Sequence, residues 1–124
     1  MKKIDWSQYP NFKESEFVCK ETGEINMDED FLARLQILRE EFGKPMAITS
    51  GYRSPRHSIE AKKLSPGPHA HGKACDIAVG GEAAYELISI ALRLGFTGIG
   101  VSQKSPNNRF IHLDTMPRSA VWSY

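Results

Sequence analysis

Two stretches of the chain carry apolar residues at helical spacing. In the first, Asp28 precedes an acidic turn, apolar positions recur from Phe31 to Phe42, and Gly43 ends the pattern. The helix dipole favours a carboxylate at the N-cap and acidic residues in the first turn, and a glycine commonly ends a helix. The second stretch, residues 82–94, is amphipathic in the same way. The pattern therefore predicts two amphipathic helices.

Other segments are short and rich in β-branched and apolar residues, which is typical of strands. They are residues 46–50, 73–79, 98–101 and 109–114. A short helix is compatible with residues 54–64. Because helices and strands do not alternate strictly, we expect an α+β domain with a small antiparallel sheet. The prediction is one domain over residues 1–124, with its helices packed on one face of the sheet and the candidate site on the other.

The N-terminal segment, up to about Met27, shows no clear hydrophobic period. Aromatic residues stand among polar ones there, and we expect them to hold irregular chain against the body of the domain: Trp6, Tyr9, Phe12 and Phe17. No apolar stretch follows the lysines near the N-terminus, so no secretory signal is predicted. The expectation is a protein that is cytoplasmic as synthesised.

Composition and charge mainly exclude functions. The 124 residues are 40% hydrophobic and 25% charged, as in soluble globular proteins, and no apolar run is long enough to span a membrane. Sixteen basic and fifteen acidic residues are mixed along the chain, which argues against a nucleic-acid or membrane surface. We expect a monomer. Cys19 and Cys75 are interpreted as reduced, partly buried thiols, with a single bridge between them as the alternative.

Alternation along two of the predicted strands separates polar from apolar side chains. In residues 73–79, Asp76 shares a face with two small alanines, and in residues 109–114, His112 shares a face with Asp114. The opposite faces carry larger apolar residues, among them Cys75, Ile77, Ile111 and Leu113. If these apolar faces pack on the helices, the two aspartates and the histidine project from the other side. The alanines leave room there for a ligand.

Two of the four histidines stand just before the strand that carries Asp76. These are His69 and His71, with Gly72 allowing a tight reversal of the chain. Two imidazole nitrogens and one carboxylate oxygen, with a fourth position open, are typical donors of a catalytic zinc site. Because no HExxH or CxxC pattern is present, spacing alone leaves a second interpretation open. In that interpretation the histidines are exposed polar residues, and Asp76 is a turn or capping acid. His57, which lies farther from the strand, is interpreted as a polar surface residue.

Four short motifs, separated from one another along the chain, surround these residues. They are Ser50-Gly-Tyr-Arg-Ser-Pro55, His69-x-x-Gly72-x-Ala74-x-Asp76, Gly98-Ile-Gly100 and Phe110-Ile-His-Leu-Asp114. Over residues 30–116 this arrangement resembles the M15 peptidase family, which contains zinc D-alanyl-D-alanine carboxypeptidases and related cell-wall endopeptidases. The short chain, with its aromatic start between Phe12 and Phe17, most resembles the compact, often phage- or prophage-borne members.

The resemblance implies roles for four residues. It makes His69, Asp76 and His112 the ligands of Zn²⁺, and it makes Arg53 the group that holds the substrate's carboxylate or the carbonyl oxygen as charge develops there. A guanidinium suits this role because it is permanently charged and forked. His71 is the competitor for a ligand role, and His69 is preferred because it alone keeps the family's spacing to Asp76.

The catalytic base is where the chain departs from the family's pattern. Several branches place an acidic residue three positions before the last histidine, and this chain has Arg109 there. The nearest candidate is Asp114, which follows His112 on the same strand face. It could take a proton from the attacking water, or it could orient a histidine as a neighbouring carboxylate. Both roles stay open. Many members also carry a serine where this chain has Gly67.

The resemblance predicts a zinc metallopeptidase that hydrolyses amide bonds in peptidoglycan stem peptides or cross-bridges, as a carboxypeptidase or an endopeptidase. Such a protein acts on the cell wall when it is released or carried by a virion. The alternative is a catalytically weak or inactive peptidase-like module, for instance in a phage particle, and Arg109 motivates it. A structural zinc domain fits poorly because only three ligands are evident. A cysteine hydrolase fits poorly because Cys75 faces the core.

Overall fold

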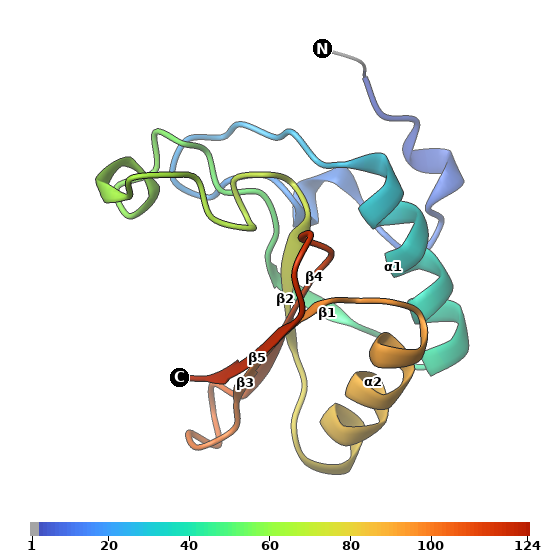
Figure 1. Ribbon diagram of the computed structural model, residues 1–124. Coiled ribbons are helices and arrows are strands. Elements are labelled where there is room, and N and C mark those ends of the chain that lie inside the picture. Colours follow the sequence, from blue (N-terminus) through green and yellow to red (C-terminus); the bar gives the residue numbers. More distant parts are fainter. Residues whose placement is uncertain (1–2) are drawn as a thin grey trace.

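The predicted strands all form, and they join one five-stranded sheet in the computed structural model, which describes residues 3–124 (Figure 1). The strands, in the sheet order β1-β2-β4-β3-β5, are β1 Ala47–Ser50, β2 Ala74–Ala78, β4 Phe110–Asp114, β3 Gly98–Ser102 and β5 Ala120–Ser123. The first four pair antiparallel, so the predicted α+β fold is confirmed. The sequence pattern does not predict β5, which pairs parallel to β3 and is mostly exposed.

Both predicted helices form, α1 over Glu29–Phe42 and α2 over Gly81–Arg93. α1 begins where the Asp28 carboxylate accepts a hydrogen bond from the N–H of Phe31 (2.9 Å). It ends at Gly43, whose φ of 70° is left-handed and therefore favours glycine. The two helices cover the same face of the sheet (Figure 1). Within the described part of the chain, no helix has the length and apolar character needed to cross a membrane.

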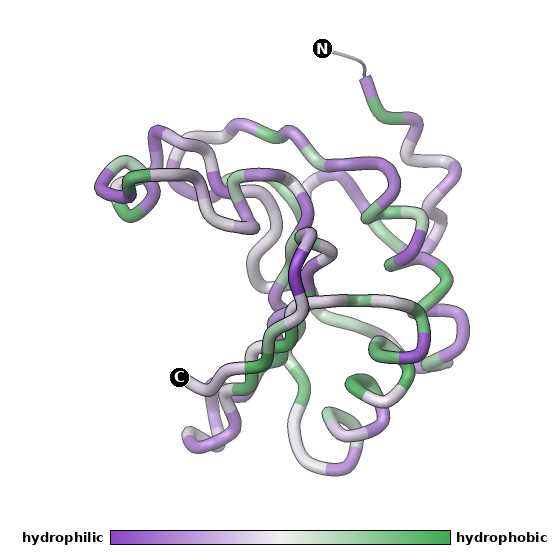
Figure 2. Tube along the Cα trace, in the orientation of Figure 1, coloured by the Kyte–Doolittle hydropathy of each residue, from purple (hydrophilic) through white to green (hydrophobic). Residues whose placement is uncertain are grey.

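The hydrophobic core lies between these helices and the sheet. Hydrophobic residues line the central strands and recur along both helices (Figure 2). The strand residues predicted to face the helices are fully buried in this core: Cys75, Ile77, Ile111 and Leu113. Both cysteines are buried, and no disulfide joins them in the structure. Because Asp76, His112 and Asp114 alternate with these buried residues, they belong to the opposite face of the sheet.

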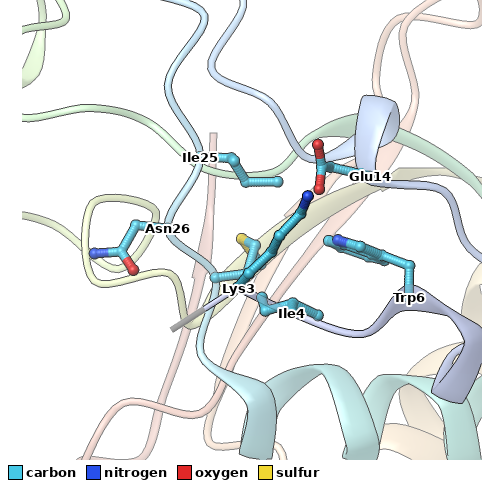
Figure 3. A pocket seen from close by; sticks show the side chains of 7 residues that line it. Lys3, Ile4, Trp6, Glu14, Ile25 and Asn26 are labelled. Atoms are coloured by element: carbon cyan, nitrogen blue, oxygen red, sulfur yellow. The ribbon is translucent and has the colours of Figure 1, made fainter. Parts of the chain in front are cut away.

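Aromatic residues hold the N-terminal segment against the domain, as predicted. The segment contains two 3₁₀ turns, Trp6–Gln8 and Glu14–Glu16, and the ring of Trp6 stacks on the buried ring of Phe17 with centroids 5.5 Å apart. A pocket of about 220 Å³ lies between this segment and residues 25–27 (Figure 3). Lys3 and Glu14 contribute charged groups to it, but no candidate site residue lines it.

Candidate metal centre

The pairing of β2 with β4 places two of the predicted ligands side by side. Asp76 is directly opposite His112 in the antiparallel register, and His69 approaches from the turn that precedes β2. One donor atom from each of these residues lies within 4.8 Å of the other two. Both histidines are buried, and Asp76 is partly buried. The structure therefore brings together the three residues that the sequence motifs singled out.

The imidazole of His69 is oriented by the backbone of the segment that directly follows β1. Its Nδ1 is 2.8 Å from the carbonyl oxygen of Gly51, and its Nε2 is 3.4 Å from Oδ1 of Asp76. Because a carbonyl can only accept a hydrogen bond, Nδ1 carries a proton, and Nε2 is the ring nitrogen that faces Asp76. The N–H of Arg53 donates in turn to the carbonyl of His69 (3.2 Å). These two contacts bind the turn at 51–53 to the loop that carries the candidate ligand.

The imidazole of His112 lies between two carboxylates. Its Nδ1 is 3.1 Å from Oδ1 of Asp76, and its Nε2 is 2.7 Å from Oδ2 of Asp114. Burial lowers the pKa of His112, but hydrogen bonds to Asp114 and Asp76 outweigh burial and the net pKa is raised. Burial raises the pKa of Asp76, yet hydrogen bonds from both histidines hold that pKa well below its usual range. Of the two ring nitrogens of His112, Nδ1 faces Asp76, while Nε2 is held by Asp114.

Asp114 is fully buried and its carboxylate is saturated with hydrogen bonds. Besides His112, it accepts two bonds from the guanidinium of Arg118 (2.8 and 2.9 Å) and one from the N–H of Met116 (3.1 Å). A Cβ on Gly98, which pairs with Asp114 across the strands, would overlap this carboxylate, so a glycine is needed there. Burial raises the pKa of Asp114, but the hydrogen bonds lower it well below its usual range. Asp114 is thus an ionised carboxylate fixed behind His112.

Arg53 lies beside the His69 loop rather than within the three-donor cluster. Its Nη1 is 3.4 Å from Oε2 of Glu60, whose carboxylate is buried in the short 3₁₀ turn Glu60–Lys62. The same carboxylate accepts hydrogen bonds from Lys63 (2.7 Å) and from the N–H of Gly67 (3.0 Å). Burial raises the pKa of Glu60, while these hydrogen bonds lower it below its usual value. An ionised Glu60 therefore holds both Arg53 and the chain that leads to His69.

Sequence reasoning missed two of these supporting residues, Glu60 and Arg118. Arg118 lies four residues after Asp114, in a segment whose residue pattern predicts no helix or strand. Glu60 is an acidic residue in a charged, irregular segment, and only its near-complete burial distinguishes it from a surface residue. The only sequence signal for either residue is an oppositely charged residue three or four positions away. Such pairs are too common in proteins to identify these residues as part of a site.

Other residues considered from the sequence lie elsewhere. His71 is exposed and is not part of the three-donor cluster. Nε2 of His57 is 3.2 Å from Oε2 of Glu21. The guanidinium of Arg109 lies against Gly80, where a Cβ on that glycine would overlap it. The side chain at position 109 is therefore turned toward the two glycines at the start of α2, Gly80 and Gly81.

The donor set fits a divalent metal ion. Two imidazole nitrogens are presented with their other ring nitrogens already hydrogen-bonded, and the third donor is an ionised carboxylate. Oriented imidazoles of this kind, combined with one carboxylate, are typical ligands of zinc. Every described buried polar side-chain atom has a hydrogen-bond partner, so the cluster is satisfied even without a metal.

Comparison with known proteins adds one finding. The family described as Peptidase M15 matches residues 10–114, which is most of the chain. The matched region contains the three candidate ligands, Arg53 and Asp114, and it ends before Arg118 and strand β5. No curated protein matches the chain significantly.

We expect His69→Ala to abolish tight zinc binding and His71→Ala to leave it unchanged. Both substitutions remove one imidazole from the same loop, but only His69 presents its Nε2 to Asp76. Zinc titration of the two purified variants, with competition against a chromophoric chelator, measures the difference. Retained affinity in His69→Ala together with loss in His71→Ala would contradict this assignment of the ligand.

Zinc affinity is expected to fall as the pH is lowered through the pKa of His112. Nδ1 must lose its proton before it can bind a metal, whereas Nε2 can keep its hydrogen bond to Asp114. Below the raised pKa of His112, affinity should drop about tenfold per pH unit, with one proton released per metal. Calorimetry in buffers of different ionisation enthalpy counts that proton. An affinity that does not change between about pH 5.5 and 8 would argue against this coupling.

Proposed function

The chain belongs to the peptidase M15 family, and from that membership and the geometry of the candidate metal centre we propose that it is a zinc metallopeptidase acting on peptidoglycan peptides. The observation that carries the proposal is the convergence of His69, Asp76 and His112, with one donor atom of each within 4.8 Å of the others. Family membership by itself supports a metallopeptidase. The peptidoglycan substrate rests on the family's cell-wall members.

Three protein ligands favour a catalytic over a structural role for the metal. Structural zinc sites are usually closed by four protein ligands, whereas catalytic sites keep one position open for water or substrate. In this proposal Nε2 of His69, a carboxylate oxygen of Asp76 and Nδ1 of His112 hold the ion. Zinc bound there supplies Lewis-acid chemistry, because it polarises an amide carbonyl and lowers the pKa of water.

Arg53 is proposed to bind the substrate oxygen on which negative charge develops, or the carboxylate at the end of the peptide. Its backbone is fixed to the carbonyl of His69, so the side chain starts close to the candidate ligands. Glu60 approaches one guanidinium nitrogen at 3.4 Å, and a guanidinium has five N–H donors to share. A guanidinium held from behind by a buried carboxylate is oriented in advance, which lowers the cost of binding an anionic oxygen.

We assign Asp114 the role of orienting His112 rather than that of the catalytic base. Its oxygens already accept hydrogen bonds from His112, Met116 and Arg118, and the side chain is fully buried. A base must reach a proton on water or substrate, and a saturated carboxylate behind a ligand is badly placed for that. By accepting the Nε2 proton, Asp114 keeps the Nδ1 lone pair of His112 toward the other donors.

A second candidate function is a peptidase-like binding or structural module, for example in a phage particle. Arg109 favours this candidate, because it occupies the position of the acid found in several branches of the family and its guanidinium lies against Gly80. The two candidates share the metal ligands and differ only in turnover.

The proposed activity is tested by incubating the zinc-loaded protein with purified peptidoglycan and measuring newly released amino groups. We expect hydrolysis that a chelator abolishes and added zinc restores, because the Lewis acid is supplied by the metal. Arg53→Lys should lower kcat/KM by about ten- to a hundredfold, since an ammonium cannot bind an oxyanion through two parallel bonds. Hydrolysis that survives complete metal removal would exclude the mechanism. Stoichiometric zinc without hydrolysis of any wall peptide would favour the second candidate.

The role of Asp114 is tested by Asp114→Asn, which keeps the shape of the side chain but removes its charge. Loss of the orienting carboxylate should weaken zinc binding by about ten- to a hundredfold, whereas loss of a base would leave the affinity unchanged and lower only kcat. The control is Asp30→Asn in the exposed first turn of α1, which should bind zinc like the parent protein. Circular dichroism of both variants is the control for folding. Unchanged zinc affinity with strongly reduced kcat in Asp114→Asn would restore the base assignment.

A further inference from the structure

Strand β5 and the residue that follows it bring an aromatic pair, Trp122 and Tyr124, to the edge of the candidate metal centre. In the sheet register, Gly100 is paired with His112 on one side and with Trp122 on the other. A Cβ on Gly100 would lie 2.7 Å from the indole nitrogen and 2.9 Å from Cβ of His112. The glycine therefore lets the indole pack against the candidate ligand, with ring centroids 5.0 Å apart. The family match, which ends at residue 114, covers neither aromatic residue.

The position of the indole is fixed from a second side. The guanidinium of Arg118 lies over the ring of Trp122, 5.5 Å from its centroid, while the same guanidinium binds Asp114 through both of its terminal nitrogens. Trp122 thus contacts both the candidate ligand His112 and the group that holds Asp114 in place. An indole packed in this way forms a rigid surface next to the donors.

Tyr124 extends the same surface toward solvent. Its ring packs on Phe110 with centroids 5.1 Å apart, and 59% of the residue is exposed. Burial of part of the ring raises the pKa of Tyr124 and hydrogen bonding to Trp122 lowers it; the charge of Asp76 raises it and that of Arg53 lowers it. Phe110 precedes His112 by two positions on β4, so the ring of Tyr124 packs on the same face of the sheet that carries the candidate ligand His112. With its pKa raised overall, the Tyr124 hydroxyl is a hydrogen-bond donor at neutral pH.

We propose that Trp122 and Tyr124 form one wall of the substrate-binding site, with the rings packing on the aliphatic part of a bound peptide and the Tyr124 hydroxyl donating a hydrogen bond to the carboxylate or carbonyl oxygen that Arg53 binds. This inference rests on the proposed function, because it names the residues that recognise the same substrate. Exposed tyrosines suit such a role, since an apolar ring and a polar tip bind at a small cost in conformational entropy.

The chain offers a direct reporter for this wall. Its two tryptophans are Trp6 and Trp122, so Trp6→Phe leaves Trp122 as the single indole. Trp6 stacks on Phe17 in the N-terminal segment, and phenylalanine keeps an aromatic ring there. Titrating the zinc-loaded Trp6→Phe protein with a synthetic stem pentapeptide should give a saturable change in Trp122 emission, which yields the Kd.

In this background, Tyr124→Phe should raise the Kd for the pentapeptide by about five- to tenfold, as expected for the loss of one hydrogen bond. Zinc affinity should stay unchanged, because the ring and its packing on Phe110 are kept. The matched control is Tyr85→Phe on α2, which removes a hydroxyl from a residue that is 76% exposed on the helical face. Its Kd should agree with that of the parent within about twofold.

The possible outcomes separate this inference from the proposed activity. A Trp122 response that Tyr124→Phe weakens supports the aromatic wall even if no peptide is hydrolysed, and then only the catalytic proposal fails. Hydrolysis of the peptide with no Trp122 response, and with equal Kd values for Tyr124→Phe and Tyr85→Phe, overturns the wall and leaves the catalytic proposal intact. Calorimetry that detects no pentapeptide binding to the zinc-loaded protein also overturns it.

Discussion

The arrangement on which the whole site depends is the antiparallel pairing of β2 with β4, in the register that sets Asp76 opposite His112. A shift of one residue in either strand would turn these side chains into the core and the core residues outward. The buried neighbours Ile77 and Ile111, which are paired directly, make such a shift costly because both pack against the helices. The same hydrophobic alternation that stabilises the fold therefore fixes the geometry of the candidate metal centre.

Burying several charges together is tolerable here because each has an opposite partner. Asp76 and Asp114 flank the imidazole of His112, and Arg118 closes the far side of Asp114 with two hydrogen bonds. In the metal-free protein, a proton on His112 balances the two carboxylates, which agrees with its raised pKa. Removing one member would leave an uncompensated buried charge, which costs about 3–5 kcal/mol in comparable networks. A metal bound at these donors would therefore compete with a proton for Nδ1 and would link metal affinity to pH.

The sequence predicts the fold where the signal is periodic. Helical spacing and capping identify α1 and α2. Alternation in β2 and β4 places Asp76, His112 and Asp114 on one face of the sheet. The motif around His69 and Asp76 also distinguishes His69 from the exposed His71, although only the folded chain shows the reason, which is the carbonyl of Gly51.

What the sequence cannot predict depends on contacts between distant segments without a periodic pattern. β5 is short and largely exposed, and its parallel pairing with β3 depends on a turn whose geometry the residue pattern does not encode. Glu60 resembles any acidic loop residue until its burial is known. Arg118 likewise acquires a role only when the turn after β4 brings it back to Asp114. The residues that support the site are consequently less predictable from the sequence than the three candidate ligands.

The most direct test of this account is a crystal structure of the zinc-loaded protein with anomalous diffraction measured on both sides of the zinc absorption edge. The account predicts one anomalous peak within coordination distance of Nε2 of His69, a carboxylate oxygen of Asp76 and Nδ1 of His112, with Asp114 still bonded to Nε2. A peak at His71 or His57, or no peak at the three donors in zinc-saturated crystals, would contradict it.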